Sequence, residues 1–383
     1  MNATETERRP EAASTETAVP ARTGIARAVH AAATAARFLL ALFLFVGALQ
    51  LMKTGAAALD VLNNGGALVR NPGATLGLGW FGALIVLSGS PIAATSLTLV
   101  AADSISELEG FTMLTGSRLG AAFVVLVVAV VYALKGGDSI HAKGGRMKPV
   151  STAVMALSTT ALIYIPSAIL GFFLLQWGPF HSIELQFPHQ FADIIDVVYG
   201  GLLARVENLP GGLIFLGGLG VLLVSFKLLD TVMPELDEKT LGAHRLRWLR
   251  AKWPMFALGS LVALITMSVS VALTVLVPLV AKKYVKREDI LPYIMGANIT
   301  TLGDTMLAAF ALHSPAAVRI VLAEVIAASL LSVIVLTFFY PQTRTLIWRF
   351  QRQMVKSKPR LAAFTAALFI SPALIIGVSN LLA

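Results

Sequence analysis

One stretch in the last third of the chain constrains the fold most: residues 295–305, which read Met-Gly-Ala-Asn-Ile-Thr-Thr-Leu-Gly-Asp-Thr. The surrounding segment is apolar enough to enter a membrane, yet the stretch holds two glycines, an asparagine, three threonines and an aspartate. In a bilayer, polar groups at this density are tolerated where they line a protein-enclosed cavity. Gly296 and Gly303 weaken a helix locally. We therefore expect an unwound membrane helix at the floor of a solute or ion site.

A second stretch, Thr115-Gly116-Ser117-Arg118-Leu119-Gly120, has the same helix-breaking character. A serine pair precedes each stretch, Ser88 and Ser90 before the first and Ser268 and Ser270 before the second. The spacings agree, because 268 − 88 and 296 − 116 both equal 180. Two landmarks with one offset predict an internal repeat, and interrupted apolar segments at matching places in two halves indicate a transport site.

The composition defines the class of protein. The chain is 56% apolar and 13% charged, whereas soluble domains hold about 25% charged residues. We therefore predict an all-α polytopic membrane protein. The net charge of +9 comes from basic residues in short loops between apolar spans, which favours membrane orientation over binding of nucleic acid. The absence of cysteine excludes disulfides and thiolate metal sites.

The apolar runs predict an order of segments. Residues 1–36 read as a disordered cytoplasmic tail, 37–177 as transmembrane repeat 1, 178–210 as an extracellular loop, 211–340 as transmembrane repeat 2, and 341–383 as a basic loop with a final span. Two segments, 76–102 and 254–281, consist of halves of about a dozen residues around a Ser-containing turn. A full span needs about 20 residues. We expect re-entrant hairpins there, with a single kinked span as the alternative.

Charge supports this topology. With the N-terminus in the cytoplasm and hairpins that do not cross, the basic loops 135–148, 230–252, 282–287 and 342–360 fall inside, and the acidic loops 103–109 and 178–210 fall outside. Three crossings per half make the second half inverted relative to the first, and the C-terminus then lies outside. We place this multi-pass chain in the plasma membrane.

The serine-containing tips are candidate substrate-binding elements: Ser88, Gly89, Ser90, Ser268 and Ser270. A helix N-terminus at such a tip offers unpaired N–H groups to an oxyanion, and serine hydroxyls both donate and accept. Close helix packing by small residues is the alternative.

The interrupted helices supply the other candidates. Arg118 and Asn298 lie at the same repeat position, since 118 + 180 = 298, and a guanidinium can bind phosphate bidentately. Oxygen atoms that suit a hard coupling cation come from five residues: Asn298, Thr300, Thr301, Asp304 and Thr305. Arg118 either binds substrate or forms a static salt bridge to Asp304. In the following span, we expect Arg319 to snorkel to the interface, and Glu324 lies deeper.

At these residues the chain resembles the sodium-dependent phosphate cotransporter family, type II and bacterial. That family has two inverted repeats, each with a Gln-Ser-Ser-Ser hairpin motif and a Gly-Ala-Asn-Ile-Gly-Thr-Thr segment. Residues 296–301, Gly-Ala-Asn-Ile-Thr-Thr, resemble the second such segment, and Leu42-Phe43-Leu44-Phe45 and Arg70-Asn71-Pro72 are also similar. The resemblance covers residues 38–340 and implies uptake of inorganic phosphate together with sodium.

The chain also departs from the family pattern. Leu87 and Met267 stand in place of the motif glutamines, Gly89 and Val269 replace the middle serines, Thr300 replaces a glycine, and the first Gly-Ala-Asn segment is reduced to Gly116-Ser117-Arg118.

The leading hypothesis is a secondary transporter of phosphate or a related small anion. It needs no cofactor beyond Na⁺ or H⁺ as the coupling ion, and a homodimer is compatible with it. The alternatives are a non-transporting scaffold or regulatory protein of the same fold, which the missing glutamines favour, and a proton-coupled transporter of another small solute. No hydrolase or metalloprotease motif is present, so we do not expect an enzyme.

Overall fold

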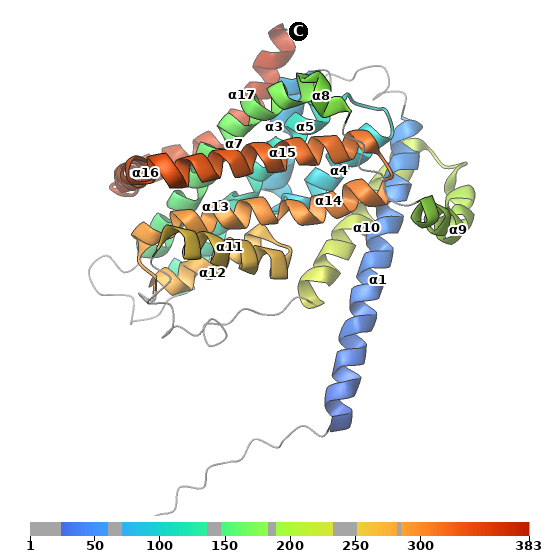
Figure 1. Ribbon diagram of the computed structural model, residues 1–383, viewed down its shortest axis with the longest axis horizontal. Coiled ribbons are helices and arrows are strands. Elements are labelled where there is room, and N and C mark those ends of the chain that lie inside the picture. The colour runs from blue at the N-terminus through green and yellow to red at the C-terminus, as the bar shows by residue number, and fades with distance from the viewer. Residues whose placement is uncertain are drawn as a thin grey trace, which may run out of the picture.

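The computed structural model describes residues 24–59, 71–135, 147–182, 189–232, 251–281 and 285–382, and within these ranges it is helical and contains no strand (Figure 1). The helices are α1 (Gly24–Ala57), α3 (Pro72–Val86), α4 (Ser90–Ala101), α5 (Glu107–Ala121), α6 (Phe123–Lys135), α7 (Met147–Gln176), α8 (Gly178–His181), α9 (His189–Val206), α10 (Gly211–Val232), α11 (Lys252–Thr266), α12 (Val269–Ala281), α13 (Leu291–Thr300), α14 (Leu302–Ala311), α15 (Pro315–Ile334), the π-helix η4 (Val335–Phe339), α16 (Tyr340–Val355) and α17 (Lys358–Leu382), with a 3₁₀ turn η3 (Arg287–Asp289).

Six helical segments of the described residues are long and apolar enough to cross a membrane: Ala28–Ala57, Glu107–Tyr132, Pro149–Gln176, Gly211–Val232, Pro315–Val355 and Lys358–Leu382. The chain is therefore all-α and has the helices of a membrane protein, as its composition predicts. Shorter apolar helices also occur, at Pro72–Val86, Ser90–Ala101 and Lys252–Thr266. At about 1.5 Å per residue, such a helix is too short to span a 30 Å hydrocarbon layer.

Both predicted hairpins form helix–turn–helix units. The chain reverses at Leu87 between α3 and α4, and at Met267 between α11 and α12. Both turn residues have left-handed backbone conformation, with φ of 56° at Leu87 and 46° at Met267. A non-glycine residue rarely adopts positive φ, so the same unusual turn recurs at positions that differ by 267 − 87 = 180.

Glycines make matching close contacts in the two halves. A Cβ atom at Gly79 of α3 would overlap the Met113 carbonyl of α5, and one at Gly259 of α11 would overlap the Tyr293 carbonyl of α13. Both members of the second pair lie 180 residues beyond those of the first. Gly116 meets the Leu76 carbonyl in the same way, and 180 residues later Gly296 meets the Phe256 carbonyl. The glycines thus let hairpin and interrupted helix pack backbone against backbone.

The interrupted helices differ from expectation in one respect. We expected unwinding at Gly116–Arg118 and around Gly296 and Gly303. Instead α5 is continuous through Gly116 and Arg118 and ends at Ala121, and α13 is continuous through Gly296. The interruptions lie at Ala122 and Thr301, and both residues keep right-handed helical backbone angles. The predicted break within residues 295–305 is present, at Thr301, but the predicted unwinding at Gly116 and Gly296 was wrong, because these glycines serve close packing and remain inside helices.

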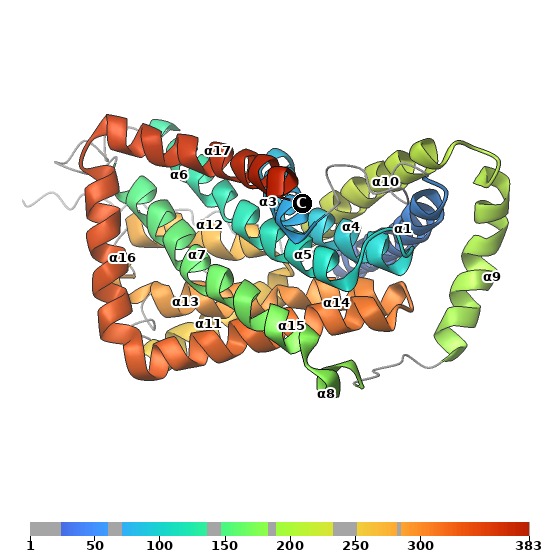
Figure 2. The same cartoon turned by 90° about the horizontal axis from the view of Figure 1, so that it is seen from above.

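The two interrupted helices run in opposite directions. In Figure 2, α5 leads towards α6 at the left, whereas α13 leads towards α14 at the right. The second helix of each hairpin packs against the distal part of the other interrupted helix, α4 against α14 and α12 against α6. Helices α7 and α15, one from each half, also pack against each other. Each half of the chain therefore completes the core of the other.

Several boundaries differ from the sequence prediction. α1 begins at Gly24, so residues 24–36, which we assigned to the tail, are helical, while residues 1–23 lie outside the described ranges. The segment 178–210 contains α8 and α9, and the segment 341–360 is mostly α16. Polar residues interrupt the apolar ones in both segments, so neither has the long apolar run of a membrane span, and we predicted loops there. The Tyr199 hydroxyl of α9 donates to the Phe43 carbonyl of α1 at 2.7 Å and anchors that helix.

Candidate functional site

Three charged side chains are buried among the residues whose side chains the structure describes: Arg118 (2% exposed), Asp304 (6%) and Glu324 (0%). They come from α5, α14 and α15, that is, from both halves of the chain. Arg118 is close enough to both carboxylates, and to Tyr164 of α7, for direct electrostatic interaction. We call Arg118, Asp304, Thr305, Glu324 and Thr115 the charged cluster.

Arg118 forms the predicted bridge between the two halves. Its Nη2 lies 3.9 Å from Asp304 Oδ1 and donates a hydrogen bond to the Thr305 hydroxyl. Thr305 in turn donates to Asp304 Oδ1 at 2.9 Å. The guanidinium thus reaches the carboxylate directly at salt-bridge distance and also through the threonine, while Arg118 Nε and Asp304 Oδ2 are buried without a hydrogen-bond partner.

Glu324 occupies the other side of the cluster. Its Oε2 accepts a hydrogen bond from the Thr115 hydroxyl at 2.7 Å, and Oε1 is buried without a partner. Thr115 also donates to the Phe111 carbonyl at 3.0 Å. A hydroxyl has one hydrogen to donate, so it satisfies the carbonyl and the carboxylate only in alternation. Glu324 therefore has a weakly compensated carboxyl group.

The first hairpin tip lies next to the cluster, and the serine hydroxyl that the structure describes at the second tip is engaged locally. Ser90 lies beside the Asp304 carboxylate, and a Cβ at Gly89 would lie 3.0 Å from the Ser117 carbonyl, next to Arg118. Ser88, beside them in the turn, is half-buried. In the second hairpin the Ser268 hydroxyl accepts from Val271 N at 3.3 Å and caps α12. Ser270 lies on α12, which packs against α6 and α7, and its side chain is outside the described residues.

The remaining predicted ion ligands lie on α13 or directly after it, and they are engaged locally. Asn298 donates to the Thr160 hydroxyl at 3.0 Å, and its carbonyl accepts from Tyr164 at 2.8 Å. Thr300 donates to the Ser260 carbonyl of α11 at 2.9 Å, and Thr301 donates to the Asn298 carbonyl at 3.0 Å. These groups attach α13 to α7 and α11. Of the predicted ion ligands, only Asp304 and Thr305 belong to the charged cluster.

Sequence reasoning missed the contribution of α7. Thr160 and Tyr164, four residues apart and therefore on one helix face, connect α7 to the interrupted helix. Polar residues at this spacing in an otherwise apolar span are the signal that could have found them. Arg319, for which we expected snorkelling, forms an ion pair with Glu107, with Nε 3.3 Å from Glu107 Oε2.

No protein-family model, curated protein or solved structure matches this chain. The fold and the cluster define the class without them: an all-α protein with six helices suited to a membrane and a buried charged cluster built from both halves. The described residues contain no group of three or more His, Cys, Asp or Glu side chains that could hold a metal ion.

Proposed function

We propose that this chain is a secondary active transporter in the plasma membrane that carries inorganic phosphate or a related small oxyanion together with a coupling cation. Arg118 carries the proposal: it is a buried guanidinium with an unpartnered Nε, beside a serine-containing hairpin tip, in a cluster that has one carboxylate more than it has bases. A guanidinium suits a tetrahedral oxyanion because its planar donors match two of the oxygens.

The proposed architecture is an inverted repeat with two re-entrant hairpins. The common offset of 180 residues in turn conformation and glycine contacts, and the opposite directions of the interrupted helices, support it. In transporters of this type, the site lies where the two halves meet and the halves move relative to each other. The charged cluster occupies such a meeting point, since α5 belongs to the first half, and α14 and α15 to the second.

The charges suggest how coupling works. With all three groups ionised, Arg118, Asp304 and Glu324 sum to −1, and a buried uncompensated charge is costly. A cation, either Na⁺ or H⁺, neutralises the surplus. When a cation also compensates the negative charge of Asp304, Arg118 no longer pairs with that carboxylate and can bind the anion. Binding of each ion then favours binding of the other, which is the linkage that cotransport requires.

A second candidate is a membrane scaffold or regulatory protein that keeps the fold without transport. The observation that favours it is the bridge among Arg118, Thr305 and Asp304, which occupies the guanidinium in the present conformation. The two candidates make different predictions for solute flux, and they agree on the fold.

The test is uptake of radiolabelled phosphate by purified protein in liposomes, with sodium and proton gradients imposed separately. We expect accumulation above equilibrium under one of the two gradients, and competition by sulfate or arsenate if the site accepts related oxyanions. Absence of gradient-dependent uptake of phosphate, sulfate and small organic anions would favour the scaffold.

A further inference from the structure

Helix α16 carries a basic surface that the proposed transport site does not use. From residue 325 to residue 383 the chain has no aspartate or glutamate, and it has six basic residues, which are Arg344, Arg349, Arg352, Lys356, Lys358 and Arg360. Five of them lie on α16 or at the start of α17, and Lys356 lies between the two helices. This concentration of one charge far exceeds what membrane orientation requires of a short connection.

A π-helix turns the chain out of the bundle direction just before this surface. Segment η4 separates α15 from α16, and Pro341 opens α16. Such π segments and prolines are recognised causes of sharp helix kinks. In Figure 2, α16 lies across the ends of α7, α15 and α17, at the opposite end of the bundle from α9. It therefore has the placement of a helix that lies along a membrane surface.

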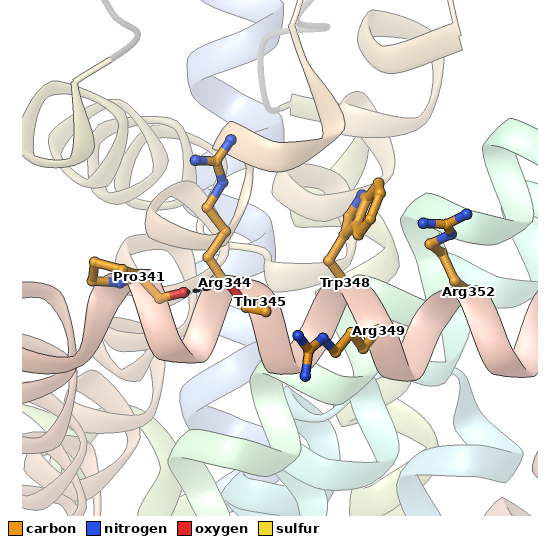
Figure 3. Close-up of a pocket in the computed structure, with 6 residues that line it drawn as sticks. All are labelled: Pro341, Arg344, Thr345, Trp348, Arg349 and Arg352. Carbon is orange, nitrogen blue, oxygen red and sulfur yellow. Dashed lines mark hydrogen bonds between the residues drawn. The ribbon is translucent and has the colours of Figure 1, made fainter.

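The faces of α16 are segregated. Thr343, Ile347 and Gln351 are buried against the bundle. A different face lines a groove of about 480 Å³, formed by Pro341, Arg344, Thr345, Trp348, Arg349 and Arg352 (Figure 3). Arg349 and Arg352 are exposed there, and Lys356 follows one turn later.

The groove combines cationic and aromatic groups at close range. The Arg352 guanidinium carbon lies 4.6 Å from the centre of the Trp348 ring. Arg344 is held by Asp289, with Nη2 3.8 Å from Oδ1, so the exposed Arg349 and Arg352 are the arginines available to a ligand. Tryptophan prefers the headgroup region of a bilayer, and arginines bind phosphate oxygens bidentately.

We propose that Trp348, Arg349 and Arg352 form a binding site for the phosphate headgroup of an anionic phospholipid at the membrane surface. The lipid phosphate contacts the two guanidinium groups, and its acyl chains enter the bilayer beside the exposed Leu346. This surface is independent of the transport site, and the site persists if the protein transports nothing. Two observations favour a lipid of the adjoining leaflet as the ligand: the positive charge of the site complements an anionic headgroup, and α16 lies across the end of the bundle.

The test measures bound lipid on detergent-solubilised protein by native mass spectrometry during titration with phosphatidylglycerol. We expect phosphatidylglycerol to bind, and phosphatidylcholine and inorganic phosphate at equal concentration not to displace it. The double variant R349Q/R352Q should weaken phosphatidylglycerol binding about thirtyfold. Each basic residue near an anionic surface lowers the dissociation constant by a factor of about five, and the two factors multiply. R205Q on α9, which removes an exposed arginine from the opposite end, is the matched control and should bind like the parent.

Two results would overturn the proposal. One is equal phosphatidylglycerol binding by R349Q/R352Q and the parent protein, which would assign the lipid to another surface. The other is displacement by inorganic phosphate alone, which would make the groove a site for a free anion. Restoration of binding by R349K/R352K would show that charge is enough, and failure to restore it would show that the planar guanidinium is needed; both outcomes support a site at these two residues.

Discussion

Arg118 is the residue at which a binding role and a static role can be separated. Removing one partner of a buried ion pair leaves an uncompensated charge and costs about 3–5 kcal/mol. We therefore expect Arg118→Ala to lower the free energy of unfolding, measured in mixed micelles, by about that amount. Arg319→Ala, which breaks the more accessible pair with Glu107, is the control and should cost about 1 kcal/mol or less.

The double variant R118A/D304A distinguishes the two roles. If Arg118 only balances Asp304, removal of both charges restores folding and phosphate flux. If Arg118 binds the anion, folding recovers but the half-saturating phosphate concentration stays raised, by about tenfold or more for the loss of a charge-assisted pair of hydrogen bonds. The transport proposal predicts the second outcome, and full recovery of flux would contradict it.

Glu324 is the residue through which the coupling ion can be tested. Glutamine has nearly the same shape as a protonated glutamate and carries no charge. In Glu324→Gln we expect exchange of labelled for unlabelled phosphate across liposomes to persist, while gradient-driven accumulation falls at least about tenfold, because the cluster no longer needs the cation. Glu207→Gln, at an exposed position just after α9, should leave both fluxes unchanged. Normal accumulation by E324Q would exclude this carboxylate from coupling.

At the scale of elements, the packing of hairpin against interrupted helix depends on glycine. A methyl group at Gly296 would overlap the Phe256 carbonyl, whereas one at Gly303 meets no atom within 4 Å. Overpacking of this kind costs about 1–3 kcal/mol. We expect Gly296→Ala to lower the free energy of unfolding by about that amount and to lower phosphate flux. Gly303→Ala, the control in the same segment, should be neutral or slightly stabilising because alanine favours a helix. Equal effects of the two variants would show that the close approach at Gly296 is unimportant.

The sequence predicted most helices, because apolar runs and turn residues are local signals. The predicted hairpin segments 76–102 and 254–281 coincide with α3–α4 and α11–α12 within a few residues. It failed for the unwinding at Gly116 and Gly296 and for α9 and α16. Gly116 and Gly296 carry the same local signal whether they unwind a helix or admit a neighbouring backbone, and only the position of α3 and α11 decides between these outcomes.

The candidate site was predictable in part for the same reason. The bridge between Arg118 and Asp304 follows from two charges in apolar segments, which must find each other or remain uncompensated. That Thr115 contacts Glu324, and that Ser268 caps its own helix, depends on distances in the folded chain. A repeat offset pairs positions in the two halves, but it does not say that paired positions have equal surroundings.

At the scale of the whole molecule, the account depends on two halves of opposite orientation. The chain contains no cysteine, so single cysteines can be introduced at exposed positions beside each hairpin. Ala58 and Asp103 flank the first hairpin, and Ala251 and Lys286 flank the second. A hairpin that re-enters without crossing leaves both of its flanks on one side of the membrane.

The most direct test is labelling of these four single-cysteine variants with a membrane-impermeant maleimide, applied to intact cells and then to inverted vesicles. The account predicts that A58C and D103C label from outside only, and that A251C and K286C label from the cytoplasmic side only. Labelling of A58C and D103C from opposite sides would mean that the first hairpin crosses the membrane, and labelling of D103C and K286C from the same side would mean that the halves are not inverted. Either result would contradict the account.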